Sequence, residues 1–302
     1  MKKLLMQSMV LSMMLIMSLT CMAQAKTLNI AVANFTIKGG NNLAGYLKRI
    51  EDLSIESRNK GAKYLLLPEL MVFELFPVDL KEEETKKYLD QVAAISKDIE
   101  EGMSNISLKH GINLIGASIV IKKDKHFINR SYYITDTGVV NYQDKVQPTP
   151  WEAKFGFIGS DKIKLFKDSN FNFVILICYD AEFPTISAAL MKNKPEIIFV
   201  PSQTGSIYGL NRVKLTSAAR AVEHMSYVFM TGVSGDLNAP WHAYAGQNFL
   251  FTPQNEYFSK EVQTGAFNVE TLSIFSIDMK KLKDARLDPK EVYPSRDAKV
   301  IK

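Results

Sequence analysis

The chain alternates short apolar runs with segments whose apolar residues recur every three or four positions. A short run of β-branched or large apolar residues between polar positions predicts a buried strand, whereas the wider spacing predicts a helix. We expect strands at 28–34, 64–67, 112–121, 173–177, 196–200 and 227–231, and helices at 42–59, 84–110, 183–192 and 210–225. Because strands and helices alternate through both halves, the pattern predicts a layered α/β fold.

Antiparallel additions and one long loop are predicted beside these elements. Two strands at 131–135 and 139–143 are joined by a turn at Asp136-Thr137-Gly138, and late strands are expected at 247–252 and 272–277. The segment 144–161 has little periodicity and contains two prolines and two glycines, which predicts a loop. The tail from Met279 is highly charged, and we expect it to pack on a partner or to be partly mobile.

The first 25 residues have the layout of a secretory signal peptide. Two lysines at positions 2 and 3 precede the apolar run 4–19, and Ala23-Gln24-Ala25 supplies the small residues of a cleavage site. The apolar run is shorter than the roughly 20 residues of a membrane-spanning helix, so a retained span is not expected. Cys21 leaves a lipoprotein as the less favoured alternative. We therefore expect export, to the periplasm or beyond, and a single domain over 26–302.

Composition and charge narrow the class of protein. The 302 residues are 46% hydrophobic and 23% charged, as in a globular protein with a sizeable core. Cleavage would remove two lysines and no acidic residue, so the formal charge of +5 would fall to +3. No basic stripe is visible, so nucleic acid is not an expected partner. Cys178 would then be the only cysteine, and a lone thiol in an oxidising compartment favours a catalytic nucleophile.

Three ionisable residues stand at comparable places along the chain. Cys178 ends the apolar strand 173–177, where a turn towards a helix N-terminus favours a thiolate. Glu69 follows the strand 64–67, and chemistry gathers at the carboxyl ends of such strands. Lys145 opens the predicted loop, where we expect an exposed side chain that contributes little to stability. Taken singly, Cys178 is equally compatible with a structural role, and a structural role is favoured for Glu69 and for Lys145.

The sequence around these residues resembles the nitrilase, or carbon-nitrogen hydrolase, superfamily. The segments that carry the resemblance are LLLPEL around Glu69, DKVQPTPWEAKFGFIGSD around Lys145 and ILICYDAEFP around Cys178, in the family's order and spacing. IIFVPS at 197–202 and SAARAVE at 217–223 extend the resemblance over nearly all of 26–302. PTPWE and FGFIGSD look closer to a poorly characterised bacterial branch. The resemblance implies a four-layer αββα sandwich that pairs into a homodimer through helices including the one after the nucleophile.

The resemblance also implies a reaction and the residues that perform it. Cys178 would attack the carbon of a small amide, carbamoyl compound or nitrile and form a thioester, with Glu69 as the general base. Lys145 and the backbone N–H of Tyr179 would stabilise the oxyanion. Glu152 matches a second family glutamate that would hold Lys145 or the leaving group, although a loop pair with Lys154 is the structural alternative. No metal or cofactor is expected.

Other matching or neighbouring positions are assigned more loosely. Candidate substrate-binding residues are Tyr179, Phe183, Trp151 and Ser202, with Tyr208 and Trp241 as further aromatic walls and the loops 72–79 and 205–211 around them. Asp180 and Arg220 are expected to support the nucleophile loop, and an ion pair between them is one way to do so. Gln147 departs from the histidine that the family often has at this place.

Three alternatives remain open at this point. A Cys-His hydrolase of the papain kind would pair Cys178 with one of the histidines at 110, 126, 224 or 242. The same site could transfer the acyl group to an amine, which resembles the apolipoprotein acyltransferases. The chain could also be an inactive binding protein that keeps the fold.

Overall fold

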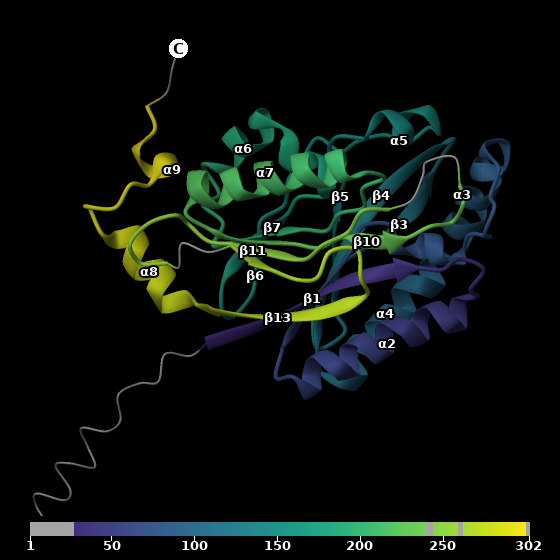
Figure 1. Cartoon of the computed structure of the whole chain (residues 1–302), viewed down its shortest axis with the longest axis horizontal. Coiled ribbons are helices and arrows are strands. Elements are labelled where there is room, and N and C mark those ends of the chain that lie inside the picture. Colours follow the sequence, from purple (N-terminus) through teal and green to yellow (C-terminus); the bar gives the residue numbers. More distant parts are fainter. Residues whose placement is uncertain (1–26, 240–243, 259–261, 300–302) are drawn as a thin grey trace, which may run out of the picture.

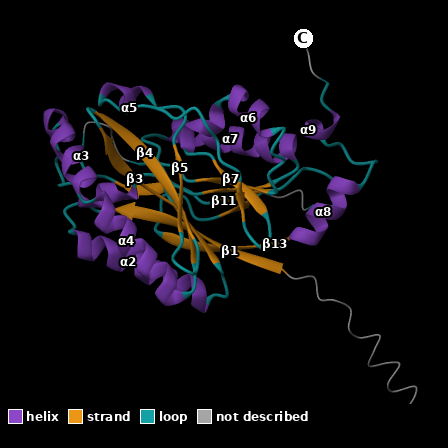
Figure 2. Ribbon diagram, turned by 180° about the vertical axis from the view of Figure 1, so that it is seen from behind, coloured by secondary structure: helices purple, strands orange, loops and turns teal. Residues whose placement is uncertain are grey.

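Strands that are apolar on both faces need cover on both sides. The computed structural model describes residues 27–239, 244–258 and 262–299, and in these ranges two mixed sheets pack face to face with helices on both outer faces (Figures 1 and 2). The predicted α/β class is confirmed, and the described residues form the four αββα layers. The predicted signal peptide at 1–25 lies outside the described residues.

The first sheet contains the strands that lead to Glu69 and Lys145. Its order within the described residues is β10-β1-β2-β3-β4-β5, with β13 on the other side of part of β1. The β1, β2 and β3 strands are parallel, and β4 and β5 continue the sheet as antiparallel neighbours. The bounds are β1 Thr27–Ile37, β2 Tyr64–Leu67, β3 Asn113–Lys123, β4 His126–Ile134, β5 Val140–Asp144, β10 Val233–Gly235 and β13 Thr271–Asp278.

The second sheet contains the strand that leads to Cys178. Its order within the described residues is β12-β11-β9-β8-β7-β6, with a parallel centre of β7, β8 and β9 and antiparallel neighbours on both sides. The bounds are β6 Phe166–Lys167, β7 Asn172–Ile175, β8 Ile197–Val200, β9 Tyr227–Met230, β11 Phe249–Phe251 and β12 Gln263–Thr264.

Helices cover the outer face of each sheet. Figure 1 shows α2 and α4 below the first sheet and α6 and α7 above the second. The helices are α2 Leu43–Asn59, α3 Thr85–Ala94, α4 Ser96–His110, α5 Pro150–Lys154, α6 Pro184–Leu190, α7 Ile207–His224, α8 Met279–Leu287 and α9 Pro294–Asp297, with 3₁₀ turns η1 Met71–Leu75, η2 Glu82–Glu84 and η3 Cys178–Glu182. No helix in the described ranges is both long enough and apolar enough to cross a membrane.

Successive side chains of the central strands alternate between the two faces of each sheet. This produces three apolar layers, one between the sheets and one under the helices on each outer face. Ile30 and Val32 of β1 face the second sheet, where they meet Phe173 and Ile175 of β7. Their neighbours on β1 face the α2–α4 layer instead, and Val174 of β7 faces α7. Successive side chains of a strand point to opposite faces, so both faces of each central strand are buried. This explains why the strands read as continuous apolar runs.

The prediction of a single helix over 84–110 is wrong. The chain forms two helices, α3 and α4, and Ile95 between them has a backbone outside the helical region, with φ −102° and ψ 11°. The apolar spacing of three and four continues through Tyr88, Val92, Ile95 and Ile99, so the periodicity carries no sign of the interruption. Both helices bury their apolar side against the same face of the first sheet.

We expected the charged tail from Met279 to pack on a partner or to be partly mobile, and this is wrong for its first turns. Residues Met279–Leu287 form α8, whose Leu282 and Ala285 are fully buried in the layer between the sheets. Further on, the Ser295 hydroxyl donates a 2.6 Å hydrogen bond to the carbonyl oxygen of Glu223 on α7. The lysines of α8 are exposed, its apolar residues pack on the chain's own core, and Arg286 donates to the backbone carbonyl oxygens of Met225 and His224.

Candidate active site

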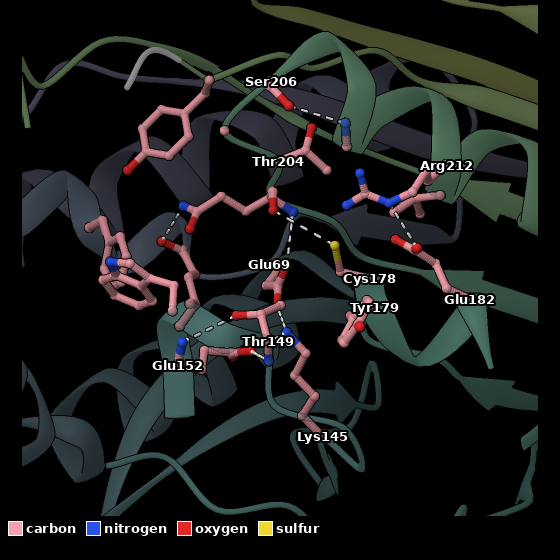
Figure 3. A pocket seen from close by; sticks show the side chains of 18 residues that line it. Glu69, Lys145, Thr149, Glu152, Cys178, Tyr179, Glu182, Thr204, Ser206 and Arg212 are labelled. Atoms are coloured by element: carbon pink, nitrogen blue, oxygen red, sulfur yellow. Dashed lines mark hydrogen bonds and ion pairs between the residues drawn. The ribbon is translucent and has the colours of Figure 1, made fainter. Parts of the chain in front are cut away.

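The carboxyl ends of strands from both sheets meet at one cavity. Glu69 follows β2, Lys145 follows β5, and Cys178 follows the apolar run of β7, so each sheet contributes to the site. Together with Glu152 of α5 they line a cavity of about 270 Å³ (Figure 3). The structure therefore brings together all four residues that the sequence singled out for catalysis.

Cys178 lies on a sharp turn at the end of its strand. Its φ is +49°, in the left-handed region that a non-glycine residue rarely adopts. Its N–H donates to the carbonyl oxygen of Pro201 at 3.0 Å, and its Sγ lies 3.7 Å from the carbonyl oxygen of Gln203. Residues in such conformations persist where the surroundings fix them, and they cluster at functional positions. Here the turn directs the thiol into the cavity.

Glu69 is held between the two sheets. Its Oε2 accepts the N–H of Gln203 at 2.9 Å, from the segment that follows β8 in the second sheet. The next residue, Leu70, donates its N–H to the Ser118 hydroxyl of β3 at 2.9 Å and accepts the side-chain amide of Gln203 at 3.3 Å. The carboxylate is thus fixed relative to Cys178 by contacts to both sheets.

A buried ammonium group joins the two glutamates. The Nζ atom of Lys145 lies 2.7 Å from Glu69 Oε1 and 2.7 Å from Glu152 Oε2, and all three side chains are about 3% exposed. The prediction that the Lys145 side chain is exposed is therefore wrong. The structural alternative for Glu152 is wrong as well, because Lys154 pairs with Glu82 at the surface. The three charges sum to −1 in a site that excludes most water.

The position of Glu152 follows from a helix start inside the predicted loop. The segment 144–161 contains the short helix α5, which begins with a capping box. The Thr149 hydroxyl accepts the N–H of Glu152 at 3.2 Å, and Glu152 Oε2 accepts the N–H of Thr149 at 2.7 Å. Threonine followed three residues later by glutamate, with Pro150 at the first helical position, is the usual sequence of such a start. This signal was available in the sequence.

Burial and neighbouring charges separate the protonation behaviour of the two glutamates. Burial raises the pKa of Glu69 and outweighs the opposing effect of Lys145, so the pKa lies above its ordinary value. Burial also acts on Glu152, but the charge and hydrogen bond of Lys145 outweigh it, and the pKa is lowered. Two carboxyl groups whose pKa values are pushed apart are typical of an acid–base site. The pKa values of the two carboxyl groups are thus shifted in opposite directions, upward for Glu69 and downward for Glu152.

The structure corrects the expectation of a thiolate at Cys178. Burial and the negative charge of Glu69 raise the pKa of the thiol well above its ordinary value, although Lys145 opposes them. For Lys145, burial lowers the pKa, but the charges of Glu152 and Glu69 raise it more, so the ammonium stays charged. Neutral Cys178 and the raised pKa of Glu69 place a thiol beside a carboxyl group that is a stronger base than an exposed glutamate.

Asp180 connects the lysine loop to the nucleophile turn. Its carboxylate accepts the N–H groups of Val146 at 3.2 Å, Gln147 at 2.8 Å and Ile177 at 3.3 Å. The expected ion pair with Arg220 is wrong, because Arg220 pairs with Glu223 and donates to the carbonyl oxygen of Ala181. Burial raises the pKa of Asp180 to about 7.

The buried asparagine that contacts both glutamates was not predicted. Asn129 of β4 is buried, and its Nδ2 donates 2.8 Å hydrogen bonds to both Glu69 Oε1 and Glu152 Oε1. The backbone carbonyl oxygen of Asn129 accepts the backbone N–H of Lys145 at 2.9 Å. In the sequence, Asn129 is one polar residue on a strand face shared with Phe127, and only this alternation indicated that its side chain points inward.

The predicted substrate-binding residues divide into two groups. Tyr179 and Trp151 line the cavity, whereas Phe183 and Ser202 do not. Phe183 packs edge-on against Tyr179 with ring centroids 4.8 Å apart, and the Ser202 hydroxyl donates to the carbonyl oxygen of Val200. Tyr208 is 76% exposed on the outer side of α7, so the prediction that it forms a wall of the substrate site is also wrong. The remaining candidate, at position 241, lies outside the described residues.

Polar residues of the second sheet's helices form the side of the cavity opposite the lysine. Glu182 of η3 and Arg212 of α7 form an ion pair of 3.0 Å, and Figure 3 shows Cys178 between this pair and the Lys145 cluster. The 205–211 segment contributes Gly205, Ser206 and Gly209, and the 72–79 segment contributes Phe73. Both predicted loops therefore reach the cavity.

The described histidines lie away from Cys178. His110 pairs with Glu51 at the surface, His126 begins β4, and His224 is enclosed by Ser187 and Ser295. None of the three lines the cavity, and position 242 is outside the described residues. This placement does not favour a papain-like Cys-His pair. Within the described residues, no three side chains of His, Cys, Asp or Glu are placed to hold a metal ion.

Comparisons with known proteins agree with this geometry. The model of the carbon-nitrogen hydrolase family matches residues 29–285. The chain belongs to the carbon-nitrogen hydrolase family. This hydrolase is 25% identical over 263 residues to a probable hydrolase, YhcX, of Bacillus subtilis, which covers 85% of the chain and 51% of that protein. The chain thus spans about half the length of that relative. It is 24% identical over 208 residues to a deaminated glutathione amidase of Synechocystis, or 64% of the chain and 74% of that protein.

Solved structures of an amidase share the fold. The amidase from Nesterenkonia sp. superposes with a TM-score of 0.70 at 21% identity, covering 85% of this chain and 92% of that one. A variant of the amidase from Nesterenkonia sp. AN1 superposes with a TM-score of 0.71 at 19% identity, covering 86% and 94%. That variant shows covalent addition of the acetamide moiety of fluoroacetamide at its active-site cysteine. The hydrolase described here therefore has the nitrilase-like fold of amidases.

The buried Lys145 cluster predicts a large loss of stability when the ammonium is removed. Lys145→Met should lower the free energy of unfolding by about 3–5 kcal/mol, because two buried carboxylates lose their partner. Lys145→Met with Glu152→Gln should recover about 1 kcal/mol or more, because one uncompensated charge is gone. Urea unfolding of the three proteins measures both differences.

Lys154→Met is the matched control for this measurement. Lys154 pairs with Glu82 at the surface, so its loss should change the free energy of unfolding by no more than about 0.5 kcal/mol. Equal stability of Lys145→Met and Lys154→Met would contradict the buried cluster.

Proposed function

We propose that this carbon-nitrogen hydrolase is an amidase that cleaves the carbon-nitrogen bond of a small amide through a thioester on Cys178. The observation that carries the proposal is the single cavity in which Cys178, Glu69 and the Lys145 ammonium converge. A volume of about 270 Å³ lies at the small end of ligand sites and suits a small acyl group. Carbamoyl compounds and nitriles are the other members of this substrate class.

Glu69 has one oxygen available for the proton of Cys178. Its Oε1 accepts from both Lys145 and Asn129, whereas its Oε2 accepts only the N–H of Gln203. The Cys178 sulfur forms a bond to the amide carbon while its proton passes to Glu69. Glu69 then gives this proton to the nitrogen, the carbon-nitrogen bond breaks, and ammonia or an amine leaves. A water molecule, deprotonated by Glu69, cleaves the thioester, and the thiol regains its proton.

Lys145 has a donor left for the developing oxyanion. An ammonium carries three N–H groups, and two are used by Glu69 and Glu152. The N–H of Tyr179 is in the first turn of η3, where backbone donors have no partner within the helix. Each such donor contributes about 3 kcal/mol of transition-state stabilisation. The two donors come from opposite sheets and converge on the position beside Cys178.

Small aliphatic amides are the first compounds to test, by similarity to the Nesterenkonia amidase, which has been solved in complex with butyramide and acrylamide. Ammonia release should be measured with a panel of such amides, carbamoyl compounds and nitriles. The wild-type chain should release ammonia, and Cys178→Ala should release none and form no covalent adduct by mass spectrometry. Retained turnover in Cys178→Ala would refute the thioester route. Measuring the carboxylic acid released without and with an added amine separates hydrolysis from acyl transfer, because transfer would replace the acid by a new amide.

The outward side of α7 supports a homodimer. Tyr208, Leu215 and Val222 are spaced seven residues apart along this helix and are 76%, 68% and 40% exposed. Residues seven apart lie on one side of a helix, so the three form an apolar stripe. Apolar patches of this kind mark protein interfaces, and we propose a second copy of this chain as the partner.

Leu215→Glu should convert the proposed dimer into a monomer, because it places a charge at the centre of the stripe. The matched control is Leu108→Glu, which alters a leucine of similar exposure, 59%, on α4 of the other helical layer. Analytical ultracentrifugation of the three proteins measures the masses. A dimer that survives Leu215→Glu, or a monomeric wild type, would exclude this interface.

We propose that the chain is exported and that residues 1–25 are removed. The motivation is the basic, apolar and small-residue order of that segment. Mass spectrometry of the protein from its native cells should give an N-terminus at Lys26. A chain that still begins at Met1, or at a lipidated Cys21, would contradict the cleavage.

A further inference from the structure

Asn129 joins the two glutamates through a second bridge. We infer that its side-chain amide is a positioning residue that fixes Glu69 and Glu152 relative to each other and keeps Glu69 ready to accept the proton of Cys178. The inference rests on the proposed amidase reaction. It concerns a residue that does not itself line the cavity but donates to two carboxylates that do.

The geometry of the bridge uses both hydrogens of one amide nitrogen. Asn129 Nδ2 is 2.8 Å from Glu69 Oε1 and 2.8 Å from Glu152 Oε1, and the residue is 1% exposed. An amide NH₂ carries two hydrogens, so each carboxylate receives one. Reversing the amide would place its Oδ1 against both carboxylates, which is electrostatically unfavourable. The donors therefore face the glutamates.

Two bridges restrain the carboxylates more than one can. Lys145 connects Glu69 Oε1 to Glu152 Oε2, and Asn129 connects Glu69 Oε1 to Glu152 Oε1. Without Asn129, the Glu152 carboxylate would be held through Oε2 alone, by the Lys145 ammonium and the N–H of Thr149. Because Glu152 accepts on both oxygens, it is fixed in orientation as well as in distance.

The backbone of Asn129 contributes to the same arrangement. Its carbonyl oxygen accepts the N–H of Lys145 at 2.9 Å, at the point where the chain leaves β5. Asn129 therefore sets the start of the Lys145 side chain and holds the two groups that its ammonium must reach. A residue on the middle of β4 is suited to this because the sheet fixes its own position.

The charge of the site explains why an amide suits this position. The groups that face Glu69 are Lys145 from the end of β5, Glu152 from α5 and Cys178 from η3, while Asp180 of η3 acts on Lys145. A second ammonium would neutralise the carboxylate and weaken it as a base. A neutral donor favours the ionised carboxylate without adding charge. Loss of the donor should move the pKa of Glu69 further upward, because burial and Glu152 already raise it.

The test uses iodoacetamide alkylation of Cys178, which needs no knowledge of the substrate. Cys178 is the only cysteine in residues 26–302, so the alkylation rate as a function of pH reports its activation by Glu69. The variants are Asn129→Leu, which keeps the size and removes the donors, and Asn129→Asp, which adds a third carboxylate. Asn113→Leu is the matched control, because Asn113 is a buried asparagine at the other end of its sheet that donates to the carbonyl oxygen of Lys63.

We expect the acidic limb of the alkylation profile to move to higher pH in Asn129→Leu and further in Asn129→Asp. Amide turnover should fall about a hundredfold in Asn129→Leu, as expected for a misplaced catalytic group. Asn113→Leu should lower the melting temperature and leave the limb in place. If Asn129→Leu does not fold, Asn129→Ser, which removes one of the two donors in a smaller side chain, gives the same measurement.

Two outcomes would overturn the inference. One is an unshifted limb in folded Asn129→Leu, and the other is a shift of equal size in Asn113→Leu. Cys178→Ala and Glu69→Gln, assayed for amide turnover in parallel, separate this from the proposed function. If those two variants retain turnover, the proposed reaction fails. If they lose it while the Asn129 variants behave as the wild type does, only the positioning role fails.

Discussion

The site depends on one buried ammonium between two carboxylates. A charge removed from water is tolerated only when its partners are close and well oriented, and Lys145 has such a partner on each side. Glu69, Lys145 and Glu152 are provided by the ends of β2 and β5 and by α5. The ion pairs therefore fix three separate elements relative to one another. Stability of this corner of the fold and the order of the catalytic groups rest on the same contacts.

Two glutamates share the lysine but differ in their remaining contacts. Glu152 also accepts from Thr149 and Asn129, so most of its acceptor sites are used and its ionised form is favoured. Glu69 has a less occupied oxygen towards the cavity, and burial dominates its behaviour. The pKa of an identical side chain is thus shifted upward at one place and downward at the other. The difference follows from the balance between burial and local hydrogen bonding.

The sequence predicted the central strands well, because buried strands have a strong local signal. It also singled out four polar residues that the structure places around one cavity. The interruption at Ile95 could not be predicted, since apolar spacing continues across it. Burial of Lys145 was missed because a lysine after a strand looks solvated until its partners, 76 and 7 residues away, are known. The role of Asn129 could not be predicted, because the alternation with Phe127 indicates only that its side chain points inward, and its partners come from distant segments. Phe183 and Ser202 lie beside the site in sequence, but their side chains point elsewhere.

Asp180 belongs to the second sheet's nucleophile turn, yet it accepts backbone N–H groups from the segment that follows the first sheet. The contact between Gln203 and Glu69 crosses the same boundary. Neither sheet alone holds a base, an oxyanion donor and a nucleophile together. The residues around the cavity therefore come together only when the two sheets are packed on each other. A chain whose sheets are apart has a cysteine without the burial and the neighbouring Glu69 that raise the pKa of its thiol.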